Sequence, residues 1–190
     1  KDYANIRQTG LIAIKLDEND ELRWIRRSSG NDEVVISTAM GQAIRFNESD
    51  ARPMGRAARG VRGIRLRPGD TVVGMDLAAG DPDLFVMSEK GYGKLTKVVN
   101  FPTHKRGGVG IKAAVVSAKT GHLITVRSLA EDDSEVIMIS TKGQTIRVGL
   151  KDIPTLGRTT QGVRVMRLKD DDSVAAIGLI QDQPITYEEE

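Results

Sequence analysis

The chain has 190 residues, of which 39% are hydrophobic and 28% are charged, a composition typical of a folded globular protein rather than a disordered one. It contains no cysteine, which excludes disulfides, thiolate metal sites and cysteine nucleophiles and fits a reducing cytoplasm. No apolar run approaches the ~18 residues that a membrane-spanning helix needs, and the formal net charge is only +2.

Alternating basic and acidic blocks make up this small net charge. Seven arginines stand between Ala43 and Arg67 against two acids, and residues 71–89 then hold four acids and no lysine or arginine. Six cations and no acid follow over residues 90–112, and seven cations stand against one acid over residues 142–169. A surface patterned in this way favours an electrostatic partner.

Short runs rich in Val and Ile, bounded by Gly, Asp, Asn and Ser, predict β-strands along the chain. The clearest are Glu33–Thr38, Leu84–Ser88 and Glu135–Ser140. Ser88–Gly91 and Ser140–Gly143 are predicted to be hairpin turns whose glycine adopts the left-handed conformation. No segment keeps a 3.6-residue apolar period, so we expect helices to be minor.

Two sequence motifs recur with one period. Gly41–Phe46 returns as Gly143–Val148 and, more loosely, as Gly91–Thr96. A second motif begins at four glycines spaced 50, 50 and 52 residues apart, which are called the anchor glycines below: Gly10, Gly60, Gly110 and Gly162. Because two independent motifs share one period, the chain is predicted to be a repeat protein.

About four strands fit into each period of roughly 50 residues. In the second period we expect them at about 61–66, 72–78, 84–88 and 93–97. Short strands in this number suit a propeller blade better than a helical repeat. The sequence therefore predicts an all-β fold of antiparallel β-propeller or β-pinwheel blades over residues 1–180, followed by an acidic, flexible tail at 181–190.

Cations occupy matched positions in this repeat: two residues after the anchor glycine, five residues after it, and four residues before it. The first set is Arg62, Lys112 and Arg164, the second Lys15, Arg65 and Arg167, and the third Arg56, Arg106 and Arg158. Solubility alone does not require cations at fixed positions. A repeated anion-binding role is therefore predicted, with solubilising surface charge as the alternative.

The third repeat contains the most glycine-rich of the basic loops, His104–Gly110. In it, two cations stand beside three glycines: Lys105, Arg106, Gly107, Gly108 and Gly110. Glycine lets successive backbone N–H groups turn toward one anion, and the cations add charge-assisted hydrogen bonds. Taken alone the loop fits a solvated hairpin turn; its place in the repeat favours an anion-binding loop.

Cations at a fixed interval match a polyanion with a regular backbone, and duplex DNA is the obvious example. The stacking aromatics of single-strand binders are scarce, and no zinc-finger, recognition-helix or RNA-binding motif is present. We therefore predict contacts to phosphates with little base specificity. A duplex that touches several blades must bend, at a cost on the order of 1–6 kcal/mol.

No catalytic or metal-binding constellation is evident. Tyr92 lies between two glycines with no nearby base, so we expect a structural or DNA-facing turn residue rather than a nucleophile. His104 and His122 are the only histidines, no acid or histidine cluster has metal-ligand spacing, and no phosphate-binding P-loop is present.

Several of these segments resemble the C-terminal domain of the DNA gyrase A subunit, which is a β-pinwheel that wraps DNA. They cover essentially all of residues 1–180 and include Gly41–Phe46, Arg52–Arg56, Gly60–Leu66, Gly91–Lys94 and Gly157–Gly162. The signature motif of that family, the gyrase A box, runs Gln-Arg-Arg-Gly-Gly-(Arg/Lys)-Gly. His104–Gly110 resembles this box but departs from it at His104 and Val109.

The resemblance implies sequence-nonspecific binding and wrapping of duplex DNA in support of ATP-dependent negative supercoiling in the cytoplasm, beside the nucleoid. The implied partners are the gyrase B subunit together with the rest of the gyrase A subunit, and no membrane is implied. ATP, Mg²⁺ and DNA cleavage would belong to other parts of that enzyme, so no cofactor is expected in this chain. About three and a half repeats would make it the later half of a larger domain.

Two alternatives stay open: the related topoisomerase IV A-type subunit, and a propeller-like protein-interaction module. The residues predicted to bind DNA come from the repeated motifs and from the box-like loop. They are Arg45, Arg56, Arg59, Arg62, Arg65, Lys94, Lys105, Arg106, Gly107, Gly108, Gly110, Lys112, Arg147, Arg158, Arg164 and Arg167. No residue is predicted to be catalytic or to bind a metal.

Overall fold

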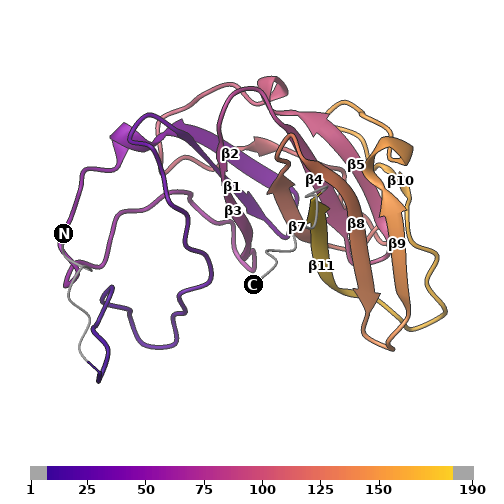
Figure 1. The fold of residues 1–190 in the computed structure, drawn as a ribbon, viewed down its shortest axis with the longest axis horizontal. Coiled ribbons are helices and arrows are strands. Elements are labelled where there is room, and N and C mark those ends of the chain that lie inside the picture. Colours follow the sequence, from indigo (N-terminus) through magenta and orange to yellow (C-terminus); the bar gives the residue numbers. More distant parts are fainter. Residues whose placement is uncertain (1–7, 182–190) are drawn as a thin grey trace, which may run out of the picture.

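The computed structural model describes residues 8–181, which form antiparallel sheets and short 3₁₀ helices without an α-helix. Three sheets follow one another along an arc, with β3, β7 and β11 on its inner side (Figure 1). The predicted all-β class is confirmed. In this part of the chain, no helix is long and apolar enough to cross a membrane.

Each sheet runs from an inner strand to an outer one, and its strands are named in that spatial order. The first sheet contains β3 (Val72–Ala78), β1 (Glu33–Thr38), β2 (Gln42–Asn47) and β6 (Ile111–Lys112). The second contains β7 (Leu123–Ser128), β4 (Asp83–Ser88), β5 (Tyr92–Lys97) and β10 (Val163–Arg164). The third contains β11 (Val174–Gln181), β8 (Asp133–Ser140) and β9 (Thr145–Gly149). The 3₁₀ helices η1 (Glu48–Asp50), η2 (Val98–Asn100) and η3 (Leu150–Asp152) follow the hairpins.

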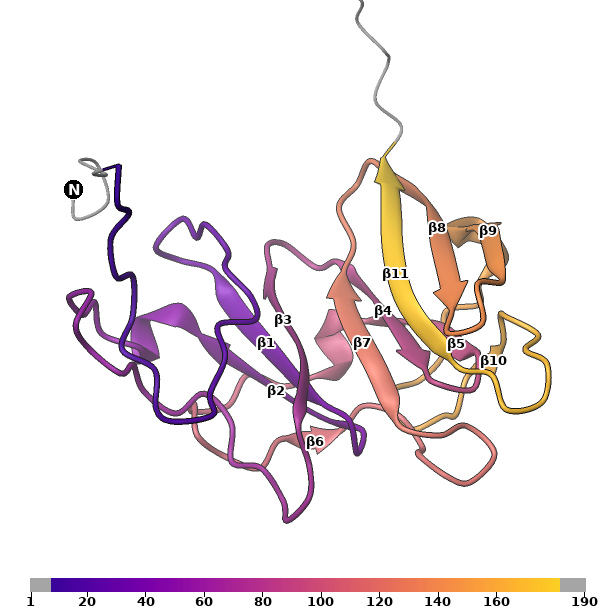
Figure 2. The same ribbon diagram turned by 90° about the horizontal axis from the view of Figure 1, so that it is seen from below.

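Each four-stranded sheet is assembled from three consecutive repeats. One hairpin supplies the two central strands, the inner strand comes from the next repeat, and the outer strand comes from the repeat after that. In the first sheet Gln42 pairs with Lys112, and in the second Tyr92 pairs with Arg164. Figure 2 shows β6 beside the end of the β1–β2 hairpin. The strands of one sequence period therefore belong to different sheets.

The strand expected at residues 61–66 is not formed. Its counterparts β6 and β10 are only two residues long, and each pairs with a hairpin strand about 70 residues earlier in the chain. Residues 61–66 run as irregular chain and bond instead to the next basic loop: the Arg65 N–H donates to the Gly108 oxygen, and the Gly63 oxygen accepts from the Gly107 N–H. The tail predicted at 181–190 lies outside the described residues except for Gln181, which ends β11.

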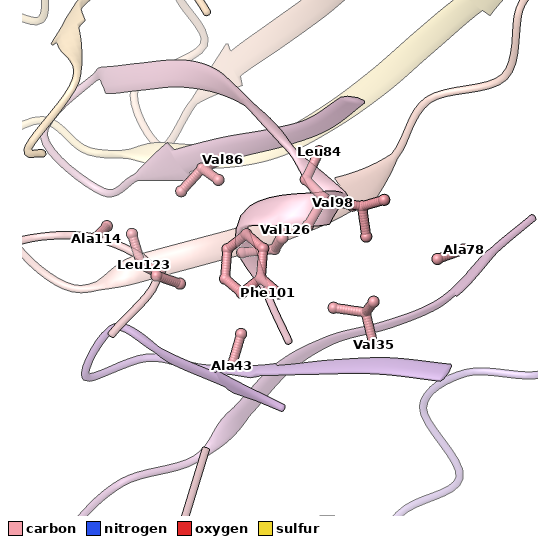
Figure 3. Packing of buried hydrophobic residues seen from close by; sticks show 11 residues of the cluster. Val35, Ala43, Ala78, Leu84, Val86, Val98, Phe101, Ala114, Leu123 and Val126 are labelled. Carbon is pink, nitrogen blue, oxygen red and sulfur yellow. The ribbon is translucent and has the colours of Figure 1, made fainter. Parts of the chain in front are cut away.

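The hydrophobic core lies between neighbouring sheets rather than within one. Phe101, directly after η2, is fully buried and lies in the middle of a cluster that joins the first and second sheets (Figure 3). Val35 and Ala43 enter this cluster from the first sheet, and Val86 and Val126 from the second. A similar cluster joins the second and third sheets. The sheets therefore bury their apolar faces only by stacking on the next repeat.

The outer strands cross the hairpins so closely that glycine is required there. Gly110 has a φ of +71°, and a Cβ at this position would lie 2.5 Å from the carbonyl oxygen of Ala43. Gly162 has a φ of +85°, and its Cβ would lie 2.5 Å from the oxygen of Gly93. At Gly60, whose segment forms no strand, a Cβ would meet nothing within 4 Å. The close approach follows from the pairing between repeats.

Replacing Phe101 by alanine is expected to reduce the free energy of unfolding by about 3–5 kcal/mol, because it leaves a cavity where, among residues 8–181, this ring is the aromatic side chain of the cluster that joins the two sheets. Val99, in the same turn, is 56% exposed, so V99A is the matched control and should change stability by less than about 0.5 kcal/mol. Urea unfolding followed by circular dichroism measures both. A decrease below about 1 kcal/mol for F101A would show that this ring does not hold the two sheets together.

Candidate nucleic-acid interface

The arginines four residues before the anchor glycines use their guanidinium groups inside the molecule. Each donates a hydrogen bond from Nη1 to a backbone oxygen of the previous repeat, at the residue two positions after that repeat's anchor glycine. The pairs are Arg56 with Ile12 at 3.3 Å, Arg106 with Arg62 at 3.0 Å, and Arg158 with Lys112 at 2.8 Å. The repetition of these arginines therefore reflects a repeated structural link.

A backbone hydrogen bond accompanies each arginine link. The donor is the N–H group of the residue five positions after an anchor glycine. The acceptor is the backbone oxygen of the residue two positions before the next anchor glycine. The N–H group of Arg65 donates to Gly108 at 2.7 Å, and that of Val115 donates to Thr160 at 3.2 Å. Lys15 and Ala58 form the same bond, also at 3.2 Å. Each basic loop is thus docked on the preceding repeat by the same pair of bonds.

The two cations of the box-like loop have different environments. Arg106 is half-buried, and its guanidinium donates to the backbone oxygens of Asp50 at 2.8 Å and Arg62 at 3.0 Å. Lys105 has a 91% exposed side chain and pairs with the Asp50 carboxylate at 3.0 Å. The N–H of Gly107 donates to Gly63, so it does not point toward an external anion. Lys105 is the cation that this loop presents to solvent.

Lys94 is buried, although the sequence predicts it to be a DNA-binding residue. Its side chain is among the largest fully buried ones, with 1% of the residue exposed. The ammonium donates to the backbone oxygens of Gly157 at 2.9 Å, Arg158 at 2.7 Å and Thr160 at 3.0 Å. The same position holds Ile44 in the previous repeat. Lys94 therefore belongs to the core and satisfies inward-facing carbonyls of the next basic loop.

Burial, helped by repulsion from the Arg158 guanidinium, lowers the pKa of Lys94 from 10.5 to about 8. Between these two pKa values the unfolded chain binds more protons than the folded chain. The contribution of Lys94 to stability therefore rises with pH across this window and is lowest below about pH 8.

This linkage predicts that wild-type protein gains stability relative to Lys94→Ile when the pH is raised from about 7.5 to 9.5. Urea unfolding of both proteins at each pH measures the difference. Lys151 is exposed, so Lys151→Ile is the control and should show a difference from wild type that does not change with pH. A constant difference for Lys94→Ile would contradict the lowered pKa.

Three further predicted cations form ion pairs. Arg45 pairs with Glu33, donates to the Val98 oxygen at 3.1 Å, and has a side chain only 12% exposed. Arg147 pairs with Glu135 in the corresponding place on the third sheet, but its side chain is 60% exposed. Arg59 pairs with Asp17 at 2.8 Å, and both side chains are 62% exposed. Exposed pairs of this kind are weak, so Arg59 and Arg147 stay accessible to an external anion.

Most of the other cations predicted to bind DNA lie free on the surface. Four of those within residues 8–181 have exposed side chains that form no hydrogen bond or ion pair: Arg62, Arg65, Lys112 and Arg167. Lys112 is part of the outer strand β6, and Arg164, also exposed, is part of the outer strand β10. The free positive charge therefore lies on the segments that follow the anchor glycines, including the outer strands β6 and β10, rather than at the arginines of the docked loops.

One cation in this region does not belong to any repeated position. Lys119 lies with its Nζ 5.4 Å from the centroid of the Tyr92 ring, and the Arg164 guanidinium lies at the same distance from it. No sequence pattern identifies Lys119, because the contact is created by folding. Among residues 8–181, no group of three or more His, Cys, Asp or Glu side chains is placed to hold a metal ion.

Arg106→Ala is expected to lower the free energy of unfolding by about 1.5–3 kcal/mol, because a charged donor is removed and two carbonyl groups are left without their partner. Lys105→Ala, the adjacent control, should stay within about 0.5 kcal/mol of wild type. Thermal or urea unfolding of the two variants is the measurement. Equal stability of both variants would show that the link through Arg106 does not hold the loop.

Interlaced antiparallel sheets with exposed cations on the outer strands β6 and β10 define a propeller-like repeat domain with a positively charged surface. A family described as DNA gyrase C-terminal domain, beta-propeller, matches residues 1–29, 32–79, 82–130 and 134–181. The chain belongs to this family, as its resemblance to the gyrase A C-terminal domain indicates.

Individual relatives agree with this assignment. The DNA gyrase A subunit of Aminobacterium colombiense is 42% identical over 179 residues, which cover 94% of this chain and 22% of that protein. The DNA gyrase A subunit of Staphylococcus epidermidis is 38% identical over 183 residues, which cover 95% of this chain and 20% of that protein. The chain thus spans about a fifth of the length of these relatives.

Solved structures show the same fold. The structure of a DNA gyrase A C-terminal domain matches with a TM-score of 0.76 at 26% identity, over 90% of this chain and 58% of that chain. The C-terminal domain of a DNA topoisomerase IV matches with a TM-score of 0.87 at 23% identity, over 95% of this chain and 56% of that chain. At the latter identity the likeness concerns the fold alone.

Proposed function

We propose that this chain binds duplex DNA along the outer edge of its sheets and bends the duplex around the arc. The observation that carries this proposal is the set of free, exposed cations at matched positions, above all Arg62 and Lys112. A DNA backbone presents phosphates at a regular spacing, which suits cations repeated by the same fold unit.

Bending supplies a reason for distributing these cations over several repeats. Smooth bending of a duplex by 40–90° costs on the order of 1–6 kcal/mol, which contacts at one repeat do not offset. Cations on successive sheets can bind phosphates along the same bent path. Neutralising a few of them should therefore abolish wrapping before it abolishes binding.

The relatives narrow the biological setting. Since proteins 38–42% identical to this chain are DNA gyrase A subunits, we infer that it acts as the C-terminal domain of such a protein. Its partners would be the gyrase B subunit together with the rest of the gyrase A subunit, in the cytoplasm. Wrapping would support negative supercoiling, with ATP and Mg²⁺ used by other parts of the enzyme. The likeness to topoisomerase IV supports the fold, and the sequence identities favour gyrase.

The double variant Arg62→Ala/Lys112→Ala is expected to bind duplex DNA more weakly and with a flatter salt dependence. The slope of log K against log salt should fall by about 0.9 for each phosphate that the variant no longer binds. Fluorescence anisotropy with mixed-sequence duplexes at several salt concentrations measures both quantities. The matched control is Arg27→Ala/Lys151→Ala, which removes the same charge from exposed positions outside the repeated sets. Its slope of log K against log salt should stay close to that of wild type.

Absence of duplex binding by the wild-type chain at low salt would overturn the proposal and favour a protein-interaction module. Wrapping has its own readout: a nicked plasmid closed by ligase in the presence of the chain should acquire a changed linking number. An unchanged linking number alongside tight binding would show binding without wrapping.

A further inference from the structure

Two cations converge on one buried aromatic ring at the outer edge of the second sheet. Tyr92, the first residue of β5, is 6% exposed and pairs in register with Arg164 of β10. Its hydroxyl accepts a hydrogen bond from Arg164 Nη2 at 3.0 Å. The Arg164 guanidinium and the Lys119 ammonium each lie 5.4 Å from the ring centroid. The Tyr92 site, as these three residues are called below, fixes two cations around one ring.

A rigid turn presents Lys119 to this ring. Thr120, the next residue, is 1% exposed, and its hydroxyl accepts a hydrogen bond from the Ser117 N–H at 3.0 Å. The Gly121 N–H closes the turn by donating to the Ser117 oxygen at 2.8 Å. Lys119 is therefore held by its backbone and not only by its attraction to the ring.

The positive charge of the Tyr92 site is not neutralised by the surrounding protein. Within residues 8–181, neither Arg164 nor Lys119 forms an ion pair. A third cation lies beside them, because Lys90 Nζ donates to the backbone oxygen of Ala118 at 2.6 Å. Glu89, the acid of the adjoining turn, lies 3.8 Å from His122. Cations gathered in one region of the surface attract an external anion.

The other repeats lack this arrangement. The position of Tyr92 holds Gln42 in the first sheet, where Lys112 takes the place of Arg164 in the pairing. Gln144 stands at the same position of the third hairpin and donates to the Arg167 backbone oxygen at 2.9 Å. The second sheet alone among the three combines an aromatic ring with an arginine and a lysine, so its affinity for an anion should exceed that of its counterparts.

We propose that the Tyr92 site binds a phosphate group of the duplex backbone, with Tyr92 as a positioning residue that orients Arg164 and Lys119. This inference rests on the proposed function. One of the five N–H donors of Arg164 is engaged by the tyrosine hydroxyl, and the others are available to phosphate oxygens. Because the ring already restricts both side chains, they lose less conformational freedom when the phosphate binds.

The test is a double-mutant cycle between Tyr92 and Arg164, measured by duplex affinity at several salt concentrations. Tyr92→Gln installs the residue of the other two hairpins and should weaken binding about three- to tenfold. In an Arg164→Ala background the same substitution should weaken binding by a smaller factor, because only the orientation of Lys119 remains to be lost. Tyr92→Phe keeps the ring but removes the hydroxyl, so its affinity should lie between those of wild type and Tyr92→Gln.

Lys119→Ala provides a variant that does not perturb the core, because Lys119 is exposed. It should reduce the salt slope by about 0.9, the value for a single phosphate. If Tyr92→Gln does not fold, the Lys119 and Arg164 variants still decide whether these cations bind phosphate, and Tyr92→Phe decides whether Tyr92 positions Arg164.

The outcomes separate this inference from the proposed function. If wild type binds no duplex, the proposed function fails and this inference falls with it. If wild type binds duplex and Arg62→Ala/Lys112→Ala weakens it, but Lys119→Ala leaves the salt slope unchanged, only this inference is overturned. If Tyr92 has only a structural role, Tyr92→Gln should lower the unfolding temperature. Its effect on duplex affinity should then simply add to the effect of Arg164→Ala.

Discussion

The fold depends on a close approach between backbones about 70 residues apart in the chain. The Ala113 N–H donates to the Gly41 oxygen at 2.8 Å, and the Val165 N–H donates to the Gly91 oxygen at 2.9 Å. Beside the first of these crossings, the Gly110 position leaves no space for a side chain against Ala43. Because the same crossings create β6 and β10, they also fix where the outer-edge cations stand. Backbone geometry therefore determines the electrostatic pattern.

Local sequence determines the strands but not their pairing. Glu33–Thr38, Leu84–Ser88 and Glu135–Ser140 are predicted from their Val and Ile content, and all three lie in strands. The repeat in the sequence does not disclose that the strands of one repeat belong to different sheets. The partner of each strand is set by hydrogen bonds to backbone far away in the sequence. Residues 61–66 have the composition of a strand but form none, and their composition alone does not disclose this.

The matched cations show why a site is harder to predict than a fold. A guanidinium that donates to carbonyl oxygens and one that donates to phosphates have the same chemistry, and both roles produce arginine at a fixed position in a repeat. Only the structure shows that Arg106 and Arg158 face backbone oxygens, whereas Arg62 and Arg167 face solvent. Lys119 lies outside the repeated positions, since its role is created by a turn that packs beside another repeat's hairpin.

The structural arginines and the free cations are nevertheless coupled. Arg106 binds the backbone oxygen of Arg62, and Arg158 binds that of Lys112. Arg62 and Lys112 thus each have a backbone oxygen held by the next repeat and a side chain that is exposed and free. When a basic loop is ordered, it fixes the backbone of Arg62 or Lys112. Under the proposed function, that residue therefore loses less conformational freedom when DNA binds. Under the proposed function, stability in one repeat and DNA affinity in the preceding one therefore depend on the same hydrogen bond.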